Sequence, residues 1–289
     1  MKSLNIIGCG SVGRTMGRLW ADHSVFSIGD VLNRSQQSAK SAVSFMGAGR
    51  PKASLGQMKR ADVFLIGTPD DRLADCCRGL ADSGLLDPDN IVFHCSGAIR
   101  SAELGSAKER GASIASVHPV KSFADPALCI ETFAGTYCGI EGDPDAAAVL
   151  SRSFEAVGGR MFSIDPEHKE IYHAASVFSC NYLTALLEIG LQAYARAGIA
   201  RETAFAIVEP IVRETIDNVL KLDTTGALTG PIARGDHRTV AKQIAALNAW
   251  EPDYCELYKR LGDVALVLSK SQGTASEESL VALSRQLDN

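Results

Sequence analysis

The sequence predicts an α/β protein in which a mostly parallel sheet is followed by an all-helical domain. A strand, a glycine-rich turn and a helix succeed one another in residues 3–20, and further short apolar runs alternate with helical patterns up to residue 163. After residue 166 only helical patterns occur. We therefore expect two domains, residues 1–165 and 166–289.

The composition narrows the classes of partner. Lys and Arg number 29 against 34 Asp and Glu, a net charge of −5, and no basic block occurs, which argues against nucleic acid. With 46% hydrophobic and 22% charged residues, the chain is typical of a soluble protein. The eight cysteines show no CxxC or Cys/His spacing, which predicts reduced thiols and no metal site.

The location is inferred from the apolar segments. The first strand begins at once, without the charged and apolar regions of a secretory signal, so a cytoplasmic location is expected. The longest apolar stretch, residues 174–197, is interrupted by Asn181, Glu188, Gln192 and Arg196. It is expected to be a buried helix and no membrane span.

The glycine-rich turn is a GxGxxG motif placed between a strand and a helix. In dinucleotide-binding units the first glycine permits the tight turn, the second brings the backbone near the pyrophosphate, and the third lets the helix pack closely. The free N–H groups of the helix start face the phosphates. A Rossmann-type domain is therefore expected, with the cofactor bound by Gly8, Gly10, Ser11, Val12 and Gly13.

The end of the second strand selects the cofactor. The strand pattern of residues 25–32 leads into Asn33, Arg34 and Ser35. An acidic residue at this place holds the ribose 2′-OH of NAD, whereas arginine with small polar neighbours accommodates the 2′-phosphate of NADP. NADP is therefore expected, and NAD is the less favoured choice. Asp30 is the competing residue, although it lies before the strand end, and a plain surface arginine at position 34 is the alternative.

The following strands also end in polar residues. Apolar runs at 62–66 and 91–94 are followed by Thr68-Pro69 and by Ser96-Gly97. Because ligands of open α/β sheets lie at the carboxyl ends of strands, these four residues are expected to line the cofactor. Short strands at 136–140 and 159–163 are expected to extend the sheet beyond six strands.

The helical part offers catalytic candidates. Helical patterns cover about 167–198, 201–222, 236–248 and 251–270. In the first of them, Lys169, His173 and Asn181 are expected to share one broad face. Hydride transfer to a carbonyl leaves an oxygen that needs a proton or a strong donor, which His or Lys supplies. The alternatives are a core histidine at 173 and a surface lysine at 169.

Two further stretches carry candidate residues. His118 follows a strand and precedes Pro119, which predicts a loop position and a rival proton donor. His94 lies inside a strand pattern and is expected to point into the sheet packing. The turn before a short helix near residue 230 exposes backbone N–H groups beside an arginine, and a helix cap without ligand is the alternative. The residues expected to bind a substrate anion there are Thr229, Gly230 and Arg234.

Taken together, these motifs resemble the Rossmann-like oxidoreductases that carry the C-terminal domain of unknown function 2520. The resemblance covers nearly the whole chain and rests on residues 8–13, 33–35, 67–70, 94–97, 118–119, 172–175 and 228–236. It implies the architecture of ketopantoate reductase, pyrroline-5-carboxylate reductase, prephenate dehydrogenase and 6-phosphogluconate dehydrogenase. In these enzymes an NAD(P) domain precedes a helical domain, here expected to be 6-phosphogluconate dehydrogenase C-terminal-like. The relatives and the largely apolar long helix imply a homodimer through that domain.

The resemblance carries over to single residues in part. Residues 181–186 resemble a segment of the ketopantoate reductases in a way that puts His173 at the position of their catalytic lysine. Their acidic residue after an Arg-x-Thr pattern is absent, because Val240 follows Thr239. Residues 117–119 resemble the loop with the catalytic histidine of prephenate dehydrogenases, and residues 228–231 resemble the substrate loop of pyrroline-5-carboxylate reductases.

The predicted function is an NADP-dependent oxidoreductase acting on CH–OH or a related donor. It would transfer hydride to or from a small carboxylate-bearing carbonyl or hydroxy compound, with a ketopantoate-like 2-oxo acid as the first choice. A prephenate-dehydrogenase-like activity, a pyrroline-5-carboxylate-reductase-like activity and a non-catalytic NADP-binding sensor are the alternatives. His173 is the expected proton donor.

Overall fold

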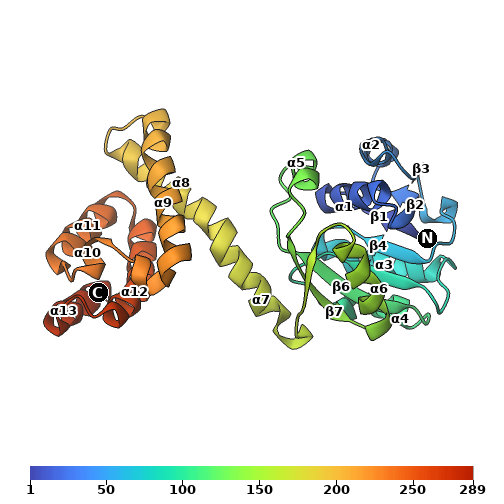
Figure 1. Cartoon of the computed structure of the whole chain (residues 1–289). Helices are drawn as coiled ribbons and strands as arrows, with labels where there is room; N and C mark the ends of the chain where they lie inside the picture. Colours follow the sequence, from blue (N-terminus) through green and yellow to red (C-terminus); the bar gives the residue numbers. More distant parts are fainter. Residues whose placement is uncertain (289) are drawn as a thin grey trace. The chain divides into compact units, whose positions relative to one another are not determined.

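The computed structural model describes residues 1–288 and divides the chain into two compact units. The first unit, Met1–Asn181, contains the sheet, and the second begins at Tyr182 and is helical (Figure 1). The sequence places the boundary earlier, after residue 165. The intervening segment belongs with the sheet because its Lys169 is buried and paired with a residue of the sheet.

Among the described residues the sheet has eight strands in the order β3-β2-β1-β4-β5-β6-β7-β8. All neighbours are parallel except β6 and β7. The first six positions have the order of a dinucleotide-binding sheet, and β7 and β8 extend it as predicted. The apolar pattern does not reveal β3, which is short and contains Pro51. The strands are β1 Lys2–Ile7, β2 Phe26–Leu32, β3 Arg50–Lys52, β4 Val63–Ile66, β5 Ile91–His94, β6 Ser113–Pro119, β7 Tyr137–Gly142 and β8 Arg160–Ser163.

Helices cover both faces of the sheet, which explains the continuous apolar runs of its parallel strands. One face is packed by α1 Ser11–Asp22, α2 Gln36–Met46, α5 Pro126–Glu131 and α6 Pro144–Glu155. The other face is packed by α3 Asp70–Asp82, α4 Gly105–Lys108 and α7 Lys169–Ser176. Short 3₁₀ turns lie at Leu55–Gln57, Ser101–Leu104 and Pro166–His168.

Trp20 of α1 is the centre of the core on the first face. Its ring makes edge-to-face contacts with Phe26, Phe93 and Phe154, with centroids 5.3 to 6.2 Å apart. Its indole N–H donates to the carbonyl oxygen of Ser153 over 3.1 Å. These contacts tie α1 to β2, β5 and α6, and so fix the direction in which the start of α1 points.

The long helix predicted over 167–198 is not one regular helix. α7 ends at Ser176, Val177–Asn181 is π-helical, and α8 covers Tyr182–Arg196. The prediction that this stretch is buried is wrong for the single chain, because Leu191 is the one buried residue of α8. Pro166–Arg196 is long and apolar enough to cross a membrane, but length and composition alone are weak evidence of a membrane span.

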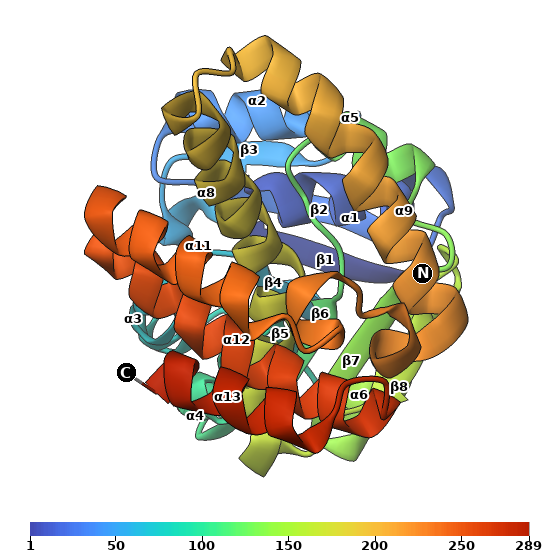
Figure 2. The ribbon, with the colours of Figure 1, turned by 90° about the vertical axis from the view of Figure 1, so that its left-hand side faces the viewer.

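The second unit is entirely helical in its described residues, as predicted. Beyond α8 it consists of α9 Arg201–Ala227, α10 Gly230–Ala233, α11 His237–Trp250, α12 Pro252–Gln272 and α13 Glu277–Asp288. The backbone of α9 leaves helical geometry at Asp223, directly after the predicted helix end. Helices α11, α12 and α13 lie side by side (Figure 2). Their shared core consists of Val240, Leu266, Leu280, Leu283 and Leu287.

Candidate active site

The glycine-rich turn between β1 and α1 is built as the motif predicts. Gly8 has φ +85°, and a Cβ there would lie 2.7 Å from Thr68. Gly10 has open space around it, and the first N–H groups of α1, Ser11 to Gly13, have no partner in the part of the chain that the structure describes. Such a helix start attracts phosphate through its free N–H groups and its dipole. The turn therefore fits a dinucleotide.

Asn33 supports this turn from the end of β2. Its Oδ1 accepts a hydrogen bond from the Cys9 N–H over 2.5 Å, and its Nδ2 donates to Ser38 Oγ over 3.0 Å. The side chain that was predicted to contact the cofactor therefore shapes the loop that would hold it. Arg34 and Ser35 follow and are exposed, and Ser35 also caps α2 by accepting from the Ser38 N–H.

Asp30 is not available to a ribose. It is fully buried, its Oδ1 pairs with Arg50 Nε over 2.8 Å, and its Oδ2 accepts from the Lys59 N–H over 2.6 Å. The competing NAD-type reading of Asp30 therefore finds no support, as expected from its place before the strand end. Arg34 has no ion-pair partner among residues 1–288. Arg34 is thus left as an exposed cation just after the end of β2.

The ends of β4 and β5 also lie at this edge of the sheet. Thr68 Oγ1 is buried without a hydrogen-bond partner in residues 1–288, and Pro69 lies directly before the start of α3. Ser96 Oγ donates to Asp70 Oδ2 over 2.9 Å and accepts from the backbone N–H of Ile99 over 3.0 Å. Ser96 therefore fixes the loop after β5, while the orphaned Thr68 hydroxyl is a polar group beside the glycine turn.

Two imidazoles and a phenol meet at Gly97 in this loop. His118 Nδ1 lies 2.8 Å from Tyr172 Oη, and the rings of His118 and His173 have centroids 5.7 Å apart. A Cβ on Gly97 would lie 2.7 Å from His118 Nε2 and closer still to the ring of His173. Only glycine lets the loop approach both imidazoles.

His118 lies in β6 opposite Gly139 of β7, so its predicted position in a loop is wrong. It stands near the end of the strand, where the antiparallel pairing with β7 continues through Pro119. Burial and the positive charges of His173 and Lys169 lower the pKa of His118 to about 4. His118 is therefore a neutral imidazole near neutral pH.

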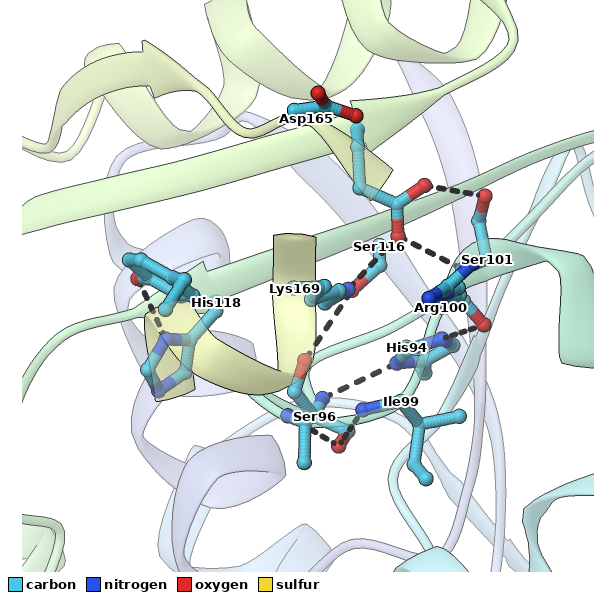
Figure 3. Close-up of polar contacts among 12 residues, drawn as sticks. His94, Ser96, Ile99, Arg100, Ser101, Ser116, His118, Asp165 and Lys169 are labelled. Atoms are coloured by element: carbon cyan, nitrogen blue, oxygen red, sulfur yellow. Dashed lines mark hydrogen bonds and ion pairs between the residues drawn. The ribbon is translucent and has the colours of Figure 1, made fainter. Parts of the chain in front are cut away.

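Lys169 is fully buried, and its side chain points toward Ser116 (Figure 3). Its Nζ donates to Glu141 Oε1 over 2.8 Å and to Ser116 Oγ, and Ser116 Oγ donates to the Ser96 carbonyl over 3.2 Å. Ser101 donates to both Glu141 oxygens through its N–H and its hydroxyl. Burial alone would raise the pKa of Glu141, but the hydrogen bonds from Lys169 and Ser101 outweigh it and lower that pKa.

The alternative of a surface lysine at position 169 is therefore wrong. The Lys169 ammonium is fully buried and donates to Ser116, whose hydroxyl donates to the Ser96 carbonyl. In this position Lys169 does not face a substrate beside His173, contrary to the expectation from the sequence. Asn181, the third residue of the expected face, is exposed at the end of the π-helical segment. The altered helical repeat of that segment breaks the regular face that the prediction assumed.

His94 is buried at the end of β5, as predicted. Its Nδ1 accepts from the Ser96 N–H over 3.1 Å, so its Nε2 carries the proton and donates to the Arg100 carbonyl over 3.3 Å (Figure 3). Burial, and then the charge of Lys169, lower the pKa of His94 to about 4. This neutral imidazole orders the loop that carries Gly97.

We expect the free energy of unfolding to fall as the pH drops from about 6.5 to about 4. The unfolded chain binds a proton at His94 in this window and the folded chain does not, a linkage on the order of 3 kcal/mol. Urea unfolding at a series of pH values measures it. His94→Asn, whose amide oxygen can still accept from Ser96, is expected to reduce the slope to the part that His118 contributes in the same window, and an unchanged slope in this variant would contradict the assignment.

The anion-binding residues predicted in the second unit lie around α10. Thr229 precedes this helix, Gly230 has φ +89°, and Arg234 is exposed at its end. Asp236 caps the next helix by accepting from the Thr239 N–H over 3.0 Å. The predicted turn before a short helix is present, and it belongs to a different unit from the imidazole pair.

Several residues around Lys169 and the imidazole pair were not predicted from the sequence. Ser116 and His118, like Glu141 and Gly139, are spaced two apart on their strands, so alternation along β6 and β7 indicates one shared face. Arg100 binds both Glu170 oxygens over 3.0 Å and so ties α7 to the loop after β5. No local motif marks Arg100, and residues 172–175 give Tyr172 no predicted contact, because the partners of both residues are distant in the sequence.

Comparisons with known proteins agree with this organisation. A model of a Rossmann-like domain matches residues 1–119, and the model of a domain of unknown function, DUF2520, matches residues 136–264. A search of curated proteins gives no significant match.

Solved structures share the fold over most of the chain. A candidate NADP oxidoreductase of Bacteroides fragilis has 18% identity and a TM-score of 0.75, and covers 91% of this chain and 97% of its own. A Thermotoga maritima protein has 25% identity and a TM-score of 0.71, with coverage of 93% and 99%. Prephenate dehydrogenase of Aquifex aeolicus has 14% identity and a TM-score of 0.55, with coverage of 91% and 98%. The chain is therefore a Rossmann-like protein whose C-terminal part carries the domain of unknown function 2520.

Proposed function

We propose that the protein is an NADP-dependent oxidoreductase that transfers hydride to or from a small carboxylate-bearing carbonyl or hydroxy compound. One observation carries this proposal: an open glycine turn and a pair of imidazoles lie at the carboxyl edge of the same sheet. Gly8 follows β1, Gly97 follows β5, and His118 lies near the end of β6. A dinucleotide bound at the switch point between β1 and β4 extends along this edge.

In this proposal the residues of the turn and Arg34 hold the cofactor, and its reduced form supplies hydride. His173 is the proposed proton donor, because burial and neighbouring charges keep the His118 imidazole neutral. Tyr172 keeps the His118 ring in place through its hydroxyl. The ring nitrogens of His173 have no hydrogen-bond partner in the described chain, so they are free to meet a substrate oxygen.

NADPH is expected to bind more tightly than NADH. Loss of the Arg34 guanidinium in Arg34→Ala removes charge-assisted hydrogen bonds to a 2′-phosphate and is expected to weaken NADPH about 10- to 100-fold. NADH affinity is expected to change less than about threefold, because NADH has no such phosphate. Fluorescence titration of both cofactors checks this. Tighter binding of NADH to the unchanged protein would refute the NADP assignment.

The substrate class is open to a direct screen. A ketopantoate-like 2-oxo acid is the first choice, and prephenate-like and pyrroline-5-carboxylate-like compounds are the alternatives. The place of His118 near the end of a strand favours the prephenate-like alternative. Single-turnover oxidation of NADPH is measured with 2-oxo acids and cyclic imines, and reduction of NADP with β-hydroxy acids. Turnover of any of these compounds would support the proposed oxidoreductase function.

A non-catalytic NADP sensor is the competing function. The burial of Lys169 and its ion pair with Glu141 favour the sensor, because the Lys169 ammonium is not accessible to a substrate at the imidazole pair. Cofactor binding without turnover of any compound in the screen would establish the sensor in place of the enzyme.

We also propose that the protein is a homodimer through its second unit. Large apolar side chains are exposed along α8, α9 and α12 of the single chain, and a patch of this kind needs a partner. A stable dimer covers about 800 Å² on each chain, which a second copy of these helices can supply. The exposed residues include Tyr182, Leu186, Phe205, Ile207, Ile211, Ile216, Leu220, Val264 and Val267.

Light scattering at micromolar concentration is expected to give twice the mass of the chain. Val264→Glu and Val267→Glu on α12, both 61% exposed, are expected to shift the mass toward one chain by placing a charge in the interface. Lys270→Glu at the end of the same helix is the control for added negative charge. A monomer in the unchanged protein would remove the proposal.

A further inference from the structure

The phenol of Tyr172 has a single hydrogen-bond partner among residues 1–288. Its Oη lies 2.8 Å from Nδ1 of His118, and this bond is the dashed line at His118 in Figure 3. The two rings meet edge to face, with centroids 5.6 Å apart. Phe162 of β8 also contacts the Tyr172 ring, with centroids 6.0 Å apart. These contacts hold the phenol against one particular nitrogen of the imidazole.

Two ion pairs fix the helix that carries Tyr172. Lys169 lies one turn before Tyr172 on α7, and its buried ammonium pairs with Glu141 of β7 over 2.8 Å. Arg100, in the loop after β5, binds both Glu170 oxygens over 3.0 Å. Because α7 is held to β7 by the first pair and to the loop by the second, the packing of α7 sets the place of the phenol.

The chemistry of the two groups decides which of them donates. A phenol is a stronger acid than the N–H of a neutral imidazole, and an imidazole nitrogen is a stronger base than a phenol oxygen. Burial raises the pKa of Tyr172 to about 12, so the phenol keeps its proton. Tyr172 Oη therefore donates to His118 Nδ1, and the one proton of the neutral ring lies on Nε2. The reverse arrangement would leave the partly buried phenol proton without a partner.

Nε2 of His118 is left without a use inside the protein. It has no hydrogen-bond partner in residues 1–288, yet it is not among the unpartnered polar atoms of these residues that are buried, so it is open to solvent. It lies beside the loop of Gly97, since a Cβ on Gly97 would be 2.7 Å from it, and a Cβ there would also touch the His173 ring. A free donor therefore stands next to the second imidazole.

His94 shows the same tautomer in a purely structural use. Its Nδ1 accepts from the Ser96 N–H over 3.1 Å, and its Nε2 donates to the Arg100 carbonyl over 3.3 Å. In His118 a phenol takes the place of the backbone N–H, and no carbonyl receives the Nε2 proton in residues 1–288. The donor that His94 uses within the loop is thus available to a ligand in His118.

We infer that Tyr172 is a positioning residue that holds the proton of His118 on Nε2, so that His118 donates a hydrogen bond to the substrate oxygen while His173 supplies the proton. The inference rests on the proposed function and deepens it. When a carbonyl carbon accepts hydride from the reduced cofactor, the electron pair of the C=O bond moves to oxygen, and the proton of His173 completes the hydroxyl. The Nε2–H of His118 stabilises the charge on that oxygen and stays on its ring.

Nitrogen NMR of the full-length protein, isotopically labelled at its histidines, reads the tautomer near neutral pH without cofactor or substrate. We expect Nε2 of His118 to be protonated and Nδ1 unprotonated. His94 is the internal reference for this pattern, because the backbone N–H at its Nδ1 can only donate. His118→Gln identifies the signals by their loss. Protonation of Nδ1 of His118 in the unchanged protein would overturn the inference.

Tyr172→Phe tests the role of the phenol. It removes the hydroxyl but keeps the ring against His118 and Phe162, so the two His118 nitrogen signals are expected to move toward each other as both tautomers become populated. We expect kcat with a substrate found in the screen to fall about tenfold, with NADPH affinity unchanged within about threefold. Tyr137→Phe is the matched control, because its exposed hydroxyl makes no hydrogen bond in residues 1–288.

The outcomes separate the inference from the proposed function. If Tyr172→Phe and Tyr137→Phe give the same nitrogen signals or the same kcat, the inference is overturned and the proposed function stands. Failure of NADPH to bind, or turnover of none of the screened compounds, overturns the proposed function, and the nitrogen signals still decide which tautomer Tyr172 sets.

Discussion

Replacing His173 with alanine is expected to lower kcat by about two to four powers of ten, the usual effect of removing a positioned acid. His173 is the proposed donor of the pair, because its ring nitrogens have no hydrogen-bond partner in the described chain, whereas burial and neighbouring charges keep His118 neutral. NADPH affinity is expected to stay within about threefold, since the glycine turn is untouched. Steady-state kinetics with a substrate found in the screen, together with NADPH titration, measures both quantities.

His118→Ala is the matched control for this prediction. It leaves His173 in place but removes the partner of the Tyr172 hydroxyl. Since the two rings act as one unit, the double variant is expected to lose little more activity than His173→Ala alone. If His173→Ala keeps near-normal turnover while His118→Ala loses it, the donor lies on β6, and a prephenate-dehydrogenase-like arrangement becomes the better model.

Replacing Lys169 with methionine is expected to lower the free energy of unfolding by about 3–5 kcal/mol. The substitution fills the space of the lysine stem but leaves the Glu141 carboxylate buried without its cation. It also removes the hydrogen bond that Ser116 accepts. Urea unfolding monitored by circular dichroism measures the loss, with the midpoint and the slope fitted separately.

The double variant Lys169→Met/Glu141→Gln separates charge from packing. It removes both charges and lets the Glu141 site keep its bonds with Ser101, so we expect it to recover about half of the lost stability. Lys242→Met at an exposed position of α11 tests the substitution by itself and is expected to change stability by less than about 0.5 kcal/mol. A loss below about 1 kcal/mol in Lys169→Met would show that the buried pair contributes little.

The sequence by itself determined the fold class and the nucleotide-binding edge. Strand, turn and helix signals are local, since apolar periodicity and glycine spacing are set by neighbouring residues. Local patterns were therefore sufficient to predict the glycine turn, the strand ends near Thr68 and Gly97 and the all-helical second part. The choice of Arg34 over Asp30 likewise followed from position along a strand, and the burial of Asp30 agrees with it.

Only the tertiary structure decided which side chains meet. Lys169 finds Glu141 and Ser116 from other elements, His118 finds Tyr172 of α7, and Asn33 binds Cys9 across 24 positions of the chain. Such pairs depend on strand order and register, above all the antiparallel β7, which a list of strands does not specify. The π-helical segment likewise shifts the face that ideal α-helical spacing assigned to Asn181. Local pattern fixes the elements, whereas the chemistry of this edge arises from long-range packing that no short stretch of sequence encodes.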